Sequence, residues 1–232
     1  LFVHLITPVP LFLLLFFNYN TKFILRISGF PKLNFFRKLL WKLTLKKIYK
    51  VTCPTNLTKD YLISLNIVDK KKIYVLQDPV LDVNKSRKLK EQNHDIKIKN
   101  YLFAAGRLTK QKNFEMLIKT VKNLRNEGFF IKLNIIGSGP DEQKLNKITE
   151  NFNYIKIDKW SKKLKIFFRN ANLFILPSFY EGSPNVLLDA VNNNVPILSS
   201  NCSGARDILK NNKQYIFKIN NLNQLKKKII DI

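Results

Sequence analysis

Cysteine and histidine are scarce in this sequence. Among 232 residues there are two cysteines, Cys53 and Cys202, and two histidines, His4 and His94. Two cysteines so widely separated give no disulfide framework of the kind that small secreted domains use, so we expect a reducing compartment. Neither histidine has a second ligand at the spacing that metal sites require. The sequence therefore predicts no metal site.

Glycine is also rare, and no apolar run is long. Seven glycines and nine prolines exclude a low-complexity chain. The apolar opening, residues 1–17, contains His4 and two prolines and is shorter than the roughly 20 residues that span a bilayer. We interpret it as the buried interior of a domain that is already under way at Leu1. The chain is therefore expected to be a fragment that lacks the first part of its amino-terminal domain.

Acidic residues are greatly outnumbered by basic ones. The chain has 41 Lys and Arg against 16 Asp and Glu, a formal net charge of +25, and no acid precedes Asp60. Such an excess can indicate a nucleic-acid or membrane partner. The charge is also spread through a sequence rich in Lys, Asn and Ile, which indicates background composition. Basic residues are densest between residues 22 and 50.

The order of apolar segments predicts an α/β fold. Hydrophobic residues make up 45% of the chain, enough for a core in one or two domains. From residue 101 onward, short apolar runs alternate with amphipathic segments, which is typical of a parallel sheet with right-handed helical crossovers. The predicted strands cover residues 101–105, 130–136, 154–157, 173–176, 195–199 and 214–218. The predicted helices cover residues 113–127, 141–150, 162–170 and 222–232, with a short one from Pro184.

Residues 1–81 alternate in the same way. An apolar helix, a basic helix and a helix from about Thr58 separate strands predicted at residues 23–27, 49–52 and 73–76. Residues 82–99 are polar, highly charged and without apolar periodicity, so we interpret them as a linker. The predicted organisation is a partial Rossmann-like domain at 1–81, the linker at 82–99 and a second Rossmann-like domain at 100–232.

Glu181 and Asp189 lie in a predicted strand–loop–helix unit. The apolar run 173–176 reads as a buried strand, and Ser183 and Pro184 suit the cap and the first position of the helix that follows. The buried stripe of this helix is predicted to consist of Leu187, Ala190 and Val191. Glu181 thus follows the carboxyl end of a strand, where open α/β sheets bind ligands and where helix N–H groups favour an anion. The alternative is a capped surface helix with two solvated acids.

A second loop, residues 105–113, follows the strand predicted at 101–105. Arg107 and Lys112 lie five residues apart across a strand-to-helix turn, where a guanidinium fork and an ammonium group could hold a diphosphate. In a basic protein such residues are usually just solvated. Because both loops follow the carboxyl ends of strands in one predicted sheet, they can face the same crevice, which favours the functional interpretation.

Four segments resemble the retaining glycosyltransferases of family 4. They are Gly106-Arg-Leu108 with Lys112-Asn113, Ile136-Gly-Ser-Gly-Pro140, Phe179-Tyr-Glu-Gly-Ser-Pro-Asn-Val-Leu-Leu-Asp189, and Ser203-Gly-Ala-Arg-Asp207. Their order and separations fit throughout residues 100–210, and the first 80 residues fit the later part of the family's acceptor domain. The resemblance implies the GT-B fold, an α/β architecture in which two Rossmann-like domains face a cleft, here with the first one incomplete.

The resemblance also implies roles for individual residues. Glu181 would touch the transferred sugar and is the expected catalytic residue, while Asp189 would bind the ribose of the nucleotide-sugar donor. Arg107 and Lys112 would neutralise the departing diphosphate with no metal and no other cofactor. The segment between the two acids would bring its backbone close to the sugar and the phosphate. The donor-binding residues expected there are Gly182, Ser183 and Asn185.

Two positions depart from the family pattern. Asp189 is one methylene shorter than the glutamate that the family usually has, although a small shift would still let it reach a ribose. Ser28, in the segment Arg26-Ile-Ser-Gly29, stands where a histidine is common in the family. We assign no catalytic role to Ser28.

The expected function is retaining transfer of a sugar from a nucleotide-diphosphate sugar to a saccharide or lipid-linked acceptor. Cell-surface polysaccharide or glycolipid synthesis in the cytoplasm is the expected setting. A sugar-nucleotide epimerase or a phosphorylase of the same fold is the alternative. A basic nucleic-acid-binding module is disfavoured because no platform of aromatic residues for base stacking is apparent. A dehydrogenase is disfavoured because Gly137-Ser-Gly139 continues to Pro140 and not to a phosphate-binding glycine pattern.

The basic helix expected at residues 33–50 allows two interpretations. Lysines recur at four-residue spacing at Lys38, Lys42 and Lys46. Another face carries the large apolar side chains of Phe36, Leu39, Leu40 and Leu43. The ordinary interpretation is a half-buried helix with a solvated basic side. The alternative is peripheral contact with the cytoplasmic face of an anionic membrane, as the resemblance implies, since family members often dock through basic acceptor-domain helices.

Overall fold

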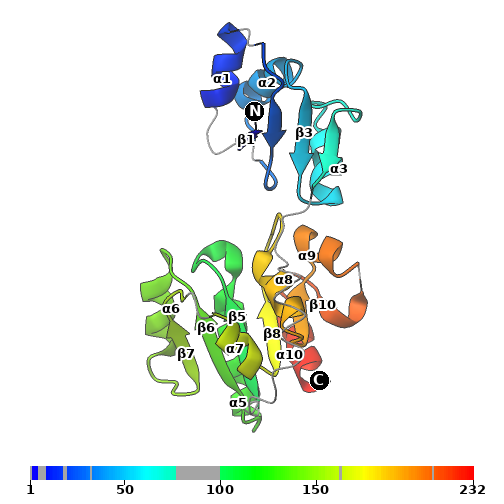
Figure 1. The fold of residues 1–232 in the computed structure, drawn as a ribbon. Coiled ribbons are helices and arrows are strands. Elements are labelled where there is room, and N and C mark those ends of the chain that lie inside the picture. The colour runs from blue at the N-terminus through cyan, green and yellow to red at the C-terminus, as the bar shows by residue number, and fades with distance from the viewer. Residues whose placement is uncertain are drawn as a thin grey trace. The chain divides into compact units, whose positions relative to one another are not determined.

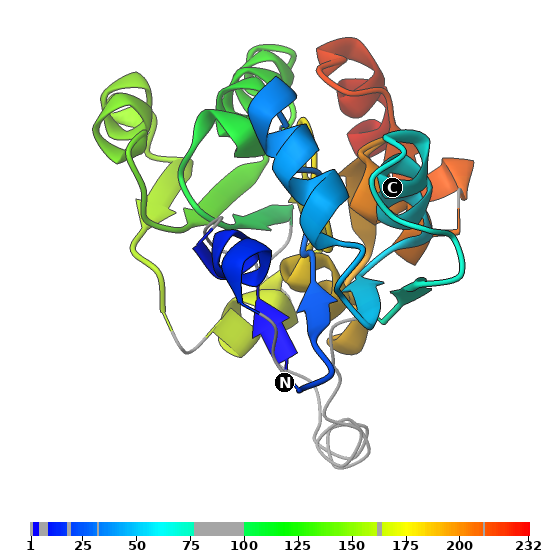
Figure 2. The ribbon, with the colours of Figure 1, turned by 90° about the horizontal axis from the view of Figure 1, so that it is seen from above.

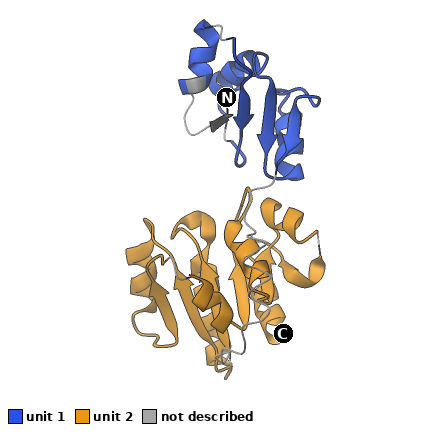
Figure 3. Ribbon diagram, viewed as in Figure 1, with its two compact units in different colours: residues 1–78 blue, residues 79–232 orange. Residues whose placement is uncertain are grey.

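The computed structural model describes residues 2–4, 9–17, 20–31, 33–76, 100–161, 164–210 and 212–232. The chain separates into two units, residues 1–78 and residues 79–232 (Figure 3). Each unit contains one parallel sheet with helices packed against it (Figure 1). The α/β class predicted from the sequence is therefore confirmed. The predicted linker at 82–99, together with His94, lies outside the described residues.

The first unit is built on a four-stranded parallel sheet whose strands follow sequence order. They are β1 (Phe2–His4), β2 (Ile24–Arg26), β3 (Lys50–Cys53) and β4 (Ile73–Val75). The helices are α1 (Val9–Phe16), α2 (Phe35–Thr44) and α3 (Asn56–Ser64). The three predicted strands are confirmed, but the apolar opening forms a strand before its helix, which the sequence analysis missed. A three-residue strand is too short to leave a period of its own in an apolar run.

The helix α2 turns its tryptophan inward and most of its other apolar residues outward. Trp41 shares a buried cluster with Leu25 and Val51 from the central strands. Phe36 is 78% exposed, and Leu39 and Leu43 are also exposed. The helix is half-buried with a solvated basic side, as the ordinary interpretation expects, but through Trp41 and Thr44, and these three residues of the expected apolar face are exposed. The indole fills the space over the sheet, so the face beside it points to solvent.

The second unit is built on a six-stranded parallel sheet in the order β10-β9-β8-β5-β6-β7. Its strands are β5 (Tyr101–Ala105), β6 (Lys132–Ile136), β7 (Ile155–Asp158), β8 (Leu173–Leu176), β9 (Ile197–Ser200) and β10 (Ile216–Phe217). The strand β5 pairs with both β6 and β8. The loops that follow these three strands therefore leave the sheet at the same edge, side by side.

Helices cover both faces of this sheet (Figure 2). On one face lie α5 (Phe114–Asn126), α6 (Glu142–Thr149) and α10 (Leu222–Ile230), which share one buried cluster with the sheet. A second buried cluster on the other face includes α7 (Leu164–Asn170), α8 (Asn185–Asn192) and α9 (Ser203–Ile208). Among the helices of the described segments, none combines the length and the apolar character that crossing a membrane requires.

The start of α8 differs from the prediction by one residue. Pro184, and not Ser183, is the N-cap residue, and the helix begins at Asn185 without a side-chain cap. Proline suits both the cap and the first helical position, so the local pattern did not decide between them. The buried residues are Val186, Leu187 and Ala190, whereas the predicted stripe residue Val191 is 45% exposed. The stripe is centred earlier on the helix, so Val191 falls at its edge.

Three further segments differ from the prediction. A single 3-10 turn, η1 (Lys110–Lys112), precedes α5, and α9 was not predicted at all. Asn113, with a φ of 53°, joins η1 to α5, because asparagine tolerates the left-handed conformation that such a junction needs. The strand predicted at 214–218 is present but shorter: β10 covers Ile216–Phe217, and the 3-10 turn η2 (Lys213–Tyr215) takes the first two predicted positions. The side chain of Asn212 accepts from the N–H of Gln214 and favours this turn.

Candidate active site

Two loops at the carboxyl end of the second sheet are joined by hydrogen bonds. They are the β5 loop (residues 106–113) and the β8 loop (residues 177–184). The N–H of Phe179 donates to the carbonyl of Gln111 at 2.9 Å, and the side-chain amide of Gln111 donates to the carbonyl of Tyr180 at 2.8 Å. The structure thus brings together the two loops that the sequence analysis singled out.

The loop after β6 packs against the β5 loop so closely that only glycine fits. A Cβ atom added at Gly137 would lie 1.9 Å from the carbonyl oxygen of Gly106. One added at Gly139 would lie 2.3 Å from the carbonyl oxygen of Leu108. The N–H of Leu108 also donates to the carbonyl of Ser138 at 3.0 Å. This segment therefore fixes the start of the β5 loop, from which Arg107 projects.

Glu181 is a buried carboxylate with two strong side-chain partners. It is 6% exposed, and its Oε1 accepts hydrogen bonds from Lys112 Nζ and Ser178 Oγ, each at 2.6 Å. Its carbonyl accepts from the Ser203 hydroxyl at 2.9 Å and from the N–H of Gly204 at 3.1 Å, which ties it to α9. Because an unpaired buried carboxylate is strongly destabilising, these partners stabilise the charged side chain in its place.

A hollow of about 600 Å³ lies beside this pair, and its lining is rich in cations. The lining residues are Arg107, Thr109, Lys110, Gln111, Lys112 and Tyr180. Arg107 is exposed, and no hydrogen bond or ion pair joins it to the part of the chain that the structure describes. A guanidinium fork and neighbouring ammonium groups suit a diphosphate. We therefore call this space the donor hollow.

Asp189 lies on α8, outside the hydrogen bonds of Glu181. It is half-buried, and burial raises the pKa of its carboxyl above the ordinary value. No ion pair holds this carboxylate within the described ranges of the chain. A partly desolvated acid without a cation is stabilised by any donor of hydrogen bonds that reaches it, such as a ligand hydroxyl.

The other predicted site residues lie between these two acids. Gly182 and Ser183 are half-buried in the β8 loop, and Asn185 is exposed at the start of α8. The role of their backbone N–H groups stays a prediction. Ser28 is exposed after β2, in the first unit.

The sequence analysis missed the residues that hold Glu181 in place. Ser178 directly precedes the motif and is completely buried, and a serine at the end of an apolar strand was a usable signal, because a buried hydroxyl needs a partner. Gln111 gave no such signal, and Ser203 opens the fourth family-like segment but received no role from the sequence. Their partners lie 69 and 22 residues away along the chain, and only the fold brings them close.

Possible metal ligands among the described residues are the side chains of His, Cys, Asp and Glu. In the segments that the structure describes, no three His, Cys, Asp or Glu side chains lie close enough together to hold a metal ion. Cys53 and Cys202 are both buried. Burial also raises the pKa of the Cys202 thiol, so this group stays protonated near neutral pH.

Comparison with known proteins gives consistent matches in sequence. A sequence model of the family described as glycosyl transferases group 1 matches residues 85–232, more than half of the chain. Protein CapJ of Staphylococcus aureus is 36% identical over 123 residues, which cover 51% of this chain and 31% of CapJ. The capsular polysaccharide biosynthesis glycosyltransferase CapM of the same organism is 31% identical over 132 residues, which cover 54% and 34%. The matched part thus spans about a third of each relative.

A solved structure shares the fold. The crystal structure of Anabaena Alr3699/HepE in complex with UDP and glucose superposes with a TM-score of 0.70 at 11% identity, covering 90% of this chain and 61% of that one. Such a low identity supports the fold alone. Together with the sequence match over residues 85–232, it leads to one conclusion: this chain belongs to the family of glycosyl transferases group 1.

Proposed function

We propose that this protein is a retaining glycosyltransferase that moves a sugar from a nucleotide-diphosphate sugar to a saccharide or lipid-linked acceptor. The observation that carries the proposal is Glu181, a buried carboxylate paired with Lys112 beside a hollow into which Arg107 brings an unpaired charge. A role in cell-surface polysaccharide synthesis is favoured by the similarity to CapM, a capsular polysaccharide biosynthesis glycosyltransferase. The complex of Alr3699/HepE with UDP and glucose favours UDP as the nucleotide.

In the proposed reaction, the bond between the anomeric carbon and the donor diphosphate breaks, and the electron pair stays with the diphosphate. Arg107 and Lys112 stabilise the negative charge that develops there. The anomeric carbon becomes oxocarbenium-like and forms its new bond to an acceptor hydroxyl, whose proton passes to an oxygen of the departing diphosphate. Both cations already line the hollow before the donor arrives, so only side-chain movements are needed to bring their charges to the diphosphate.

The pairing of Lys112 with Glu181 gives donor binding a specific consequence. The Lys112 side chain is 14% exposed and the Glu181 side chain 8% exposed, so water gives little screening of this ion pair. A diphosphate that draws Lys112 toward itself leaves a carboxylate oxygen of Glu181 ready to accept from a sugar hydroxyl. Asp189, which lacks a cation, would accept from the ribose. The half-buried β8 loop would place its backbone against the sugar and the phosphate.

Calorimetric titration of UDP into the chain tests the donor site. Arg107→Gln and Lys112→Gln should each weaken binding by about 1.5–3 kcal/mol, the scale of a charge-assisted hydrogen bond. Lys132→Gln is the matched control, because Lys132 is exposed at the start of β6, the opposite end of the strand from the loops. Unchanged affinity in both site variants, with folding intact, would refute the assignment. A similar loss in the control would indicate general charge attraction.

We also propose that the transfer needs no divalent metal. Arg107 and Lys112 supply positive charge at the diphosphate, which is the task a metal performs in many phosphate-leaving reactions. Activity should therefore survive a chelator. Loss of activity on chelation that magnesium or manganese restores would show the proposal to be wrong.

A second proposal concerns where the protein works: peripherally, on the cytoplasmic face of an anionic membrane. It is favoured by the α1–α2 surface, defined as the exposed apolar side chains of these two contacting helices. These side chains are 43–78% exposed and are Val9, Phe12, Leu13, Phe16, Phe35, Phe36, Leu39 and Leu43. Lys38 and Lys42 are exposed on the same helix α2. Large apolar groups beside lysines match the composition of helices that lie in a membrane interface.

A further inference from the structure

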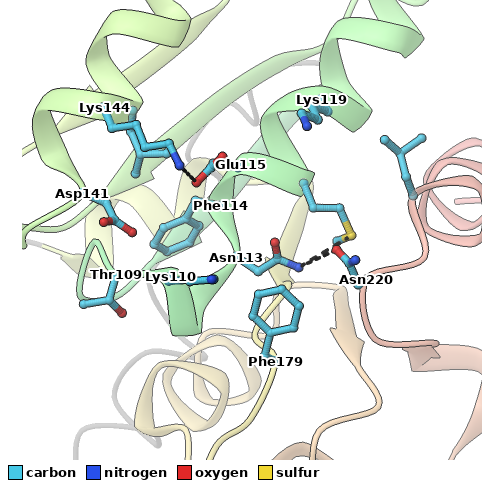
Figure 4. A pocket seen from close by; sticks show the side chains of 13 residues that line it. Thr109, Lys110, Asn113, Phe114, Glu115, Lys119, Asp141, Lys144, Phe179 and Asn220 are labelled. Carbon is cyan, nitrogen blue, oxygen red and sulfur yellow. Dashed lines mark hydrogen bonds and ion pairs between the residues drawn. The ribbon is translucent and has the colours of Figure 1, made fainter.

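A pocket of about 430 Å³ lies in the second unit next to the donor hollow (Figure 4). The two spaces share Thr109 and Lys110 and are otherwise lined by different residues. The starts of α5, α6 and α10 form most of the second lining, together with Phe179 from the β8 loop. Its volume is in the range of small-molecule sites. No part of the donor chemistry proposed above uses it.

The charges of this pocket are unevenly paired. Lys144 donates a hydrogen bond of 2.6 Å to the Glu115 carboxylate, and this bond raises the pKa of Lys144. Lys110 and Lys119 also line the pocket, and no hydrogen bond or ion pair joins the ammonium group of either to the residues that the structure places. Pairing therefore leaves two ammonium groups available to an anion, one from η1 and one from the second turn of α5.

The remaining lining combines aromatic rings with hydroxyl-bonding groups. The rings of Phe114 and Phe179 line the pocket, and Phe114 is almost completely buried. The amides of Asn113 and Asn220 also line it and are linked by a hydrogen bond of 3.3 Å. Asp141, at the start of α6, offers a carboxylate. The lining is therefore mostly polar, with apolar side chains between the polar groups, and convergent polar groups are what orient a ligand in its site.

We propose that this pocket binds an anionic monosaccharide unit, a pyranose that carries a carboxylate or a phosphate. Lys110 and Lys119 bind the anionic group. The apolar face of the sugar ring packs against Phe179, and its hydroxyls exchange hydrogen bonds with Asn220 and Asp141. A simple inorganic anion would use the lysines but leave the aromatic and amide groups without a partner. A neutral sugar would leave the lysines unused, so the lining as a whole favours an acidic sugar.

Calorimetric titration of the 232-residue chain with glucuronate and with glucose 6-phosphate tests the site, at saturating UDP so that the donor hollow is occupied. Glucose is the neutral control ligand. At least one acidic sugar should bind saturably, and Lys119→Gln should weaken that binding by about tenfold or more, the effect of losing one charge-assisted contact. The stronger of the two ligands identifies the anionic group as a carboxylate or a phosphate.

Two control variants separate this site from its neighbour. Lys132→Gln removes an exposed lysine far from the pocket and should leave acidic-sugar binding unchanged. Arg107→Gln should weaken UDP but not the acidic sugar, so the two proposals can fail independently. Lysine and glutamine have similar helix propensity, and Lys119 is exposed, so Lys119→Gln should keep its fold and its thermal unfolding temperature.

Several outcomes would overturn the proposal. One is that neither acidic sugar binds saturably, or that glucose binds as well as they do. Another is that Lys119→Gln and Lys132→Gln change the affinity for the acidic sugar equally. Arg107→Gln weakens the acidic sugar while Lys119→Gln does not, which would place that sugar in the donor hollow.

Discussion

The lysines of α2, beside the α1–α2 surface of the first unit, are exposed, and no acid among the described residues pairs with them. The second unit differs in its strand-end loops, by which we mean the loops that follow β5, β6 and β8. On α2, Lys38 and Lys42 are exposed to solvent beside apolar side chains that are also exposed. In the strand-end loops, Lys112 has lost most of its exposure and is paired with Glu181. A solvated lysine contributes little to the fold, whereas a lysine paired with a buried acid is coupled to both the fold and the site.

The difference shows which charges are informative in a strongly basic protein. The net charge of +25 identifies neither the site nor the surface by itself. The site is identified by one buried carboxylate and by the cations that the sheet places beside it. The surface is identified by apolar residues that remain exposed among the lysines, since lysines alone are the ordinary covering of a protein.

The largest expected effect tests how rigid the strand-end loops are. Gly137→Ala would place a Cβ 1.9 Å from a backbone oxygen, so the loop after β6 must move or unfold. We expect the free energy of unfolding of the second unit to fall by about 3 kcal/mol or more, at the upper end of overpacking effects. Trp160 lies in this unit and Trp41 in the other, so single-tryptophan forms report each unit separately in denaturant titrations.

Gly29→Ala is the matched control in the first unit. A Cβ there meets nothing within 4 Å, so the change should alter the stability of the first unit by less than about 1 kcal/mol. Equal destabilisation by the two substitutions would contradict the difference in packing between Gly137, which is crowded, and Gly29, which is not.

The next effect concerns turnover. Glu181→Gln keeps the size of the side chain and removes its charge, and it should lower kcat by between about a hundredfold and a thousandfold, the scale of a group that acts mainly in the transition state. Asp189→Ala should mainly raise KM for the donor, and Asp189→Glu should be tolerated. Steady-state kinetics on the longest active form of the protein compares the three variants. Normal turnover by Glu181→Gln would mean that the fold is present without this chemistry.

The α1–α2 surface is tested with vesicles. Replacing Lys38, Lys42 and Lys46 by Gln should lower the partition onto anionic vesicles by about a hundredfold, since each lysine near such a surface contributes on the order of 1 kcal/mol. UDP binding should not change. Co-sedimentation over a range of salt concentrations measures the partition.

Two controls sharpen this result. The first replaces three exposed lysines of the second unit, Lys132, Lys147 and Lys227, and should have little effect. The second replaces Phe35 and Phe36 by Ala, which removes apolar contact while keeping every charge. If that variant bound the vesicles as well as the unchanged protein, the two rings would play no part in docking, and charge attraction alone would explain the binding. Tight, UDP-insensitive binding to a polynucleotide would favour the nucleic-acid alternative.

The smallest effect concerns Asp189. Burial raises the pKa of its carboxyl in the folded chain, so the folded state holds its proton more tightly than the unfolded state does. Stability should therefore fall as pH rises from the ordinary aspartate value, about 3.9, through the raised folded pKa. Asp189→Asn should remove this fall and stabilise the second unit at pH 7 by about a few tenths of a kcal/mol, because the carboxyl is only partly buried and water screens its charge. Denaturant titrations of both forms at pH 3 and pH 7 measure the difference in their free energies of unfolding. If Asp189→Asn stabilised the unit more at pH 3 than at pH 7, the expected pH dependence would be wrong.

Sequence periodicity predicted most strands of the second sheet. It did not predict the short helix α9 or which side chains of α2 are exposed. The bounds of β5 and β8 were predicted correctly because each is an apolar run that ends at a clear break. The helix α9 was missed, since its six residues are too few to show a helical period. The exposed side chains of α2 could not be foreseen either. Which face of an amphipathic helix is buried depends on the neighbour it packs against, here through Trp41.

For the candidate site, the sequence predicted the main residues but not the contacts between them. Arg107, Lys112 and Glu181 could be named from the sequence because they sit at fixed offsets from strand ends. The direct pairing of Lys112 with Glu181 could not, because it depends on the register between β5 and β8. The hydroxyl of Ser203 reaches Glu181 only through the placement of α9. Contacts between segments distant in sequence are set by packing, which a local pattern does not contain.

The hydrogen bonds between the β5 loop and the β8 loop have a consequence for how such proteins can be recombined. The bonded residues are 69 positions apart, so a crossover anywhere between them gives a chimera whose two loops come from different parents. Gln111 and Lys112 would then meet unfamiliar partners at Tyr180 and Glu181. Donor preference should therefore be inherited as a block that includes both loops, and a swap of either loop alone should give a folded sheet with a disordered site.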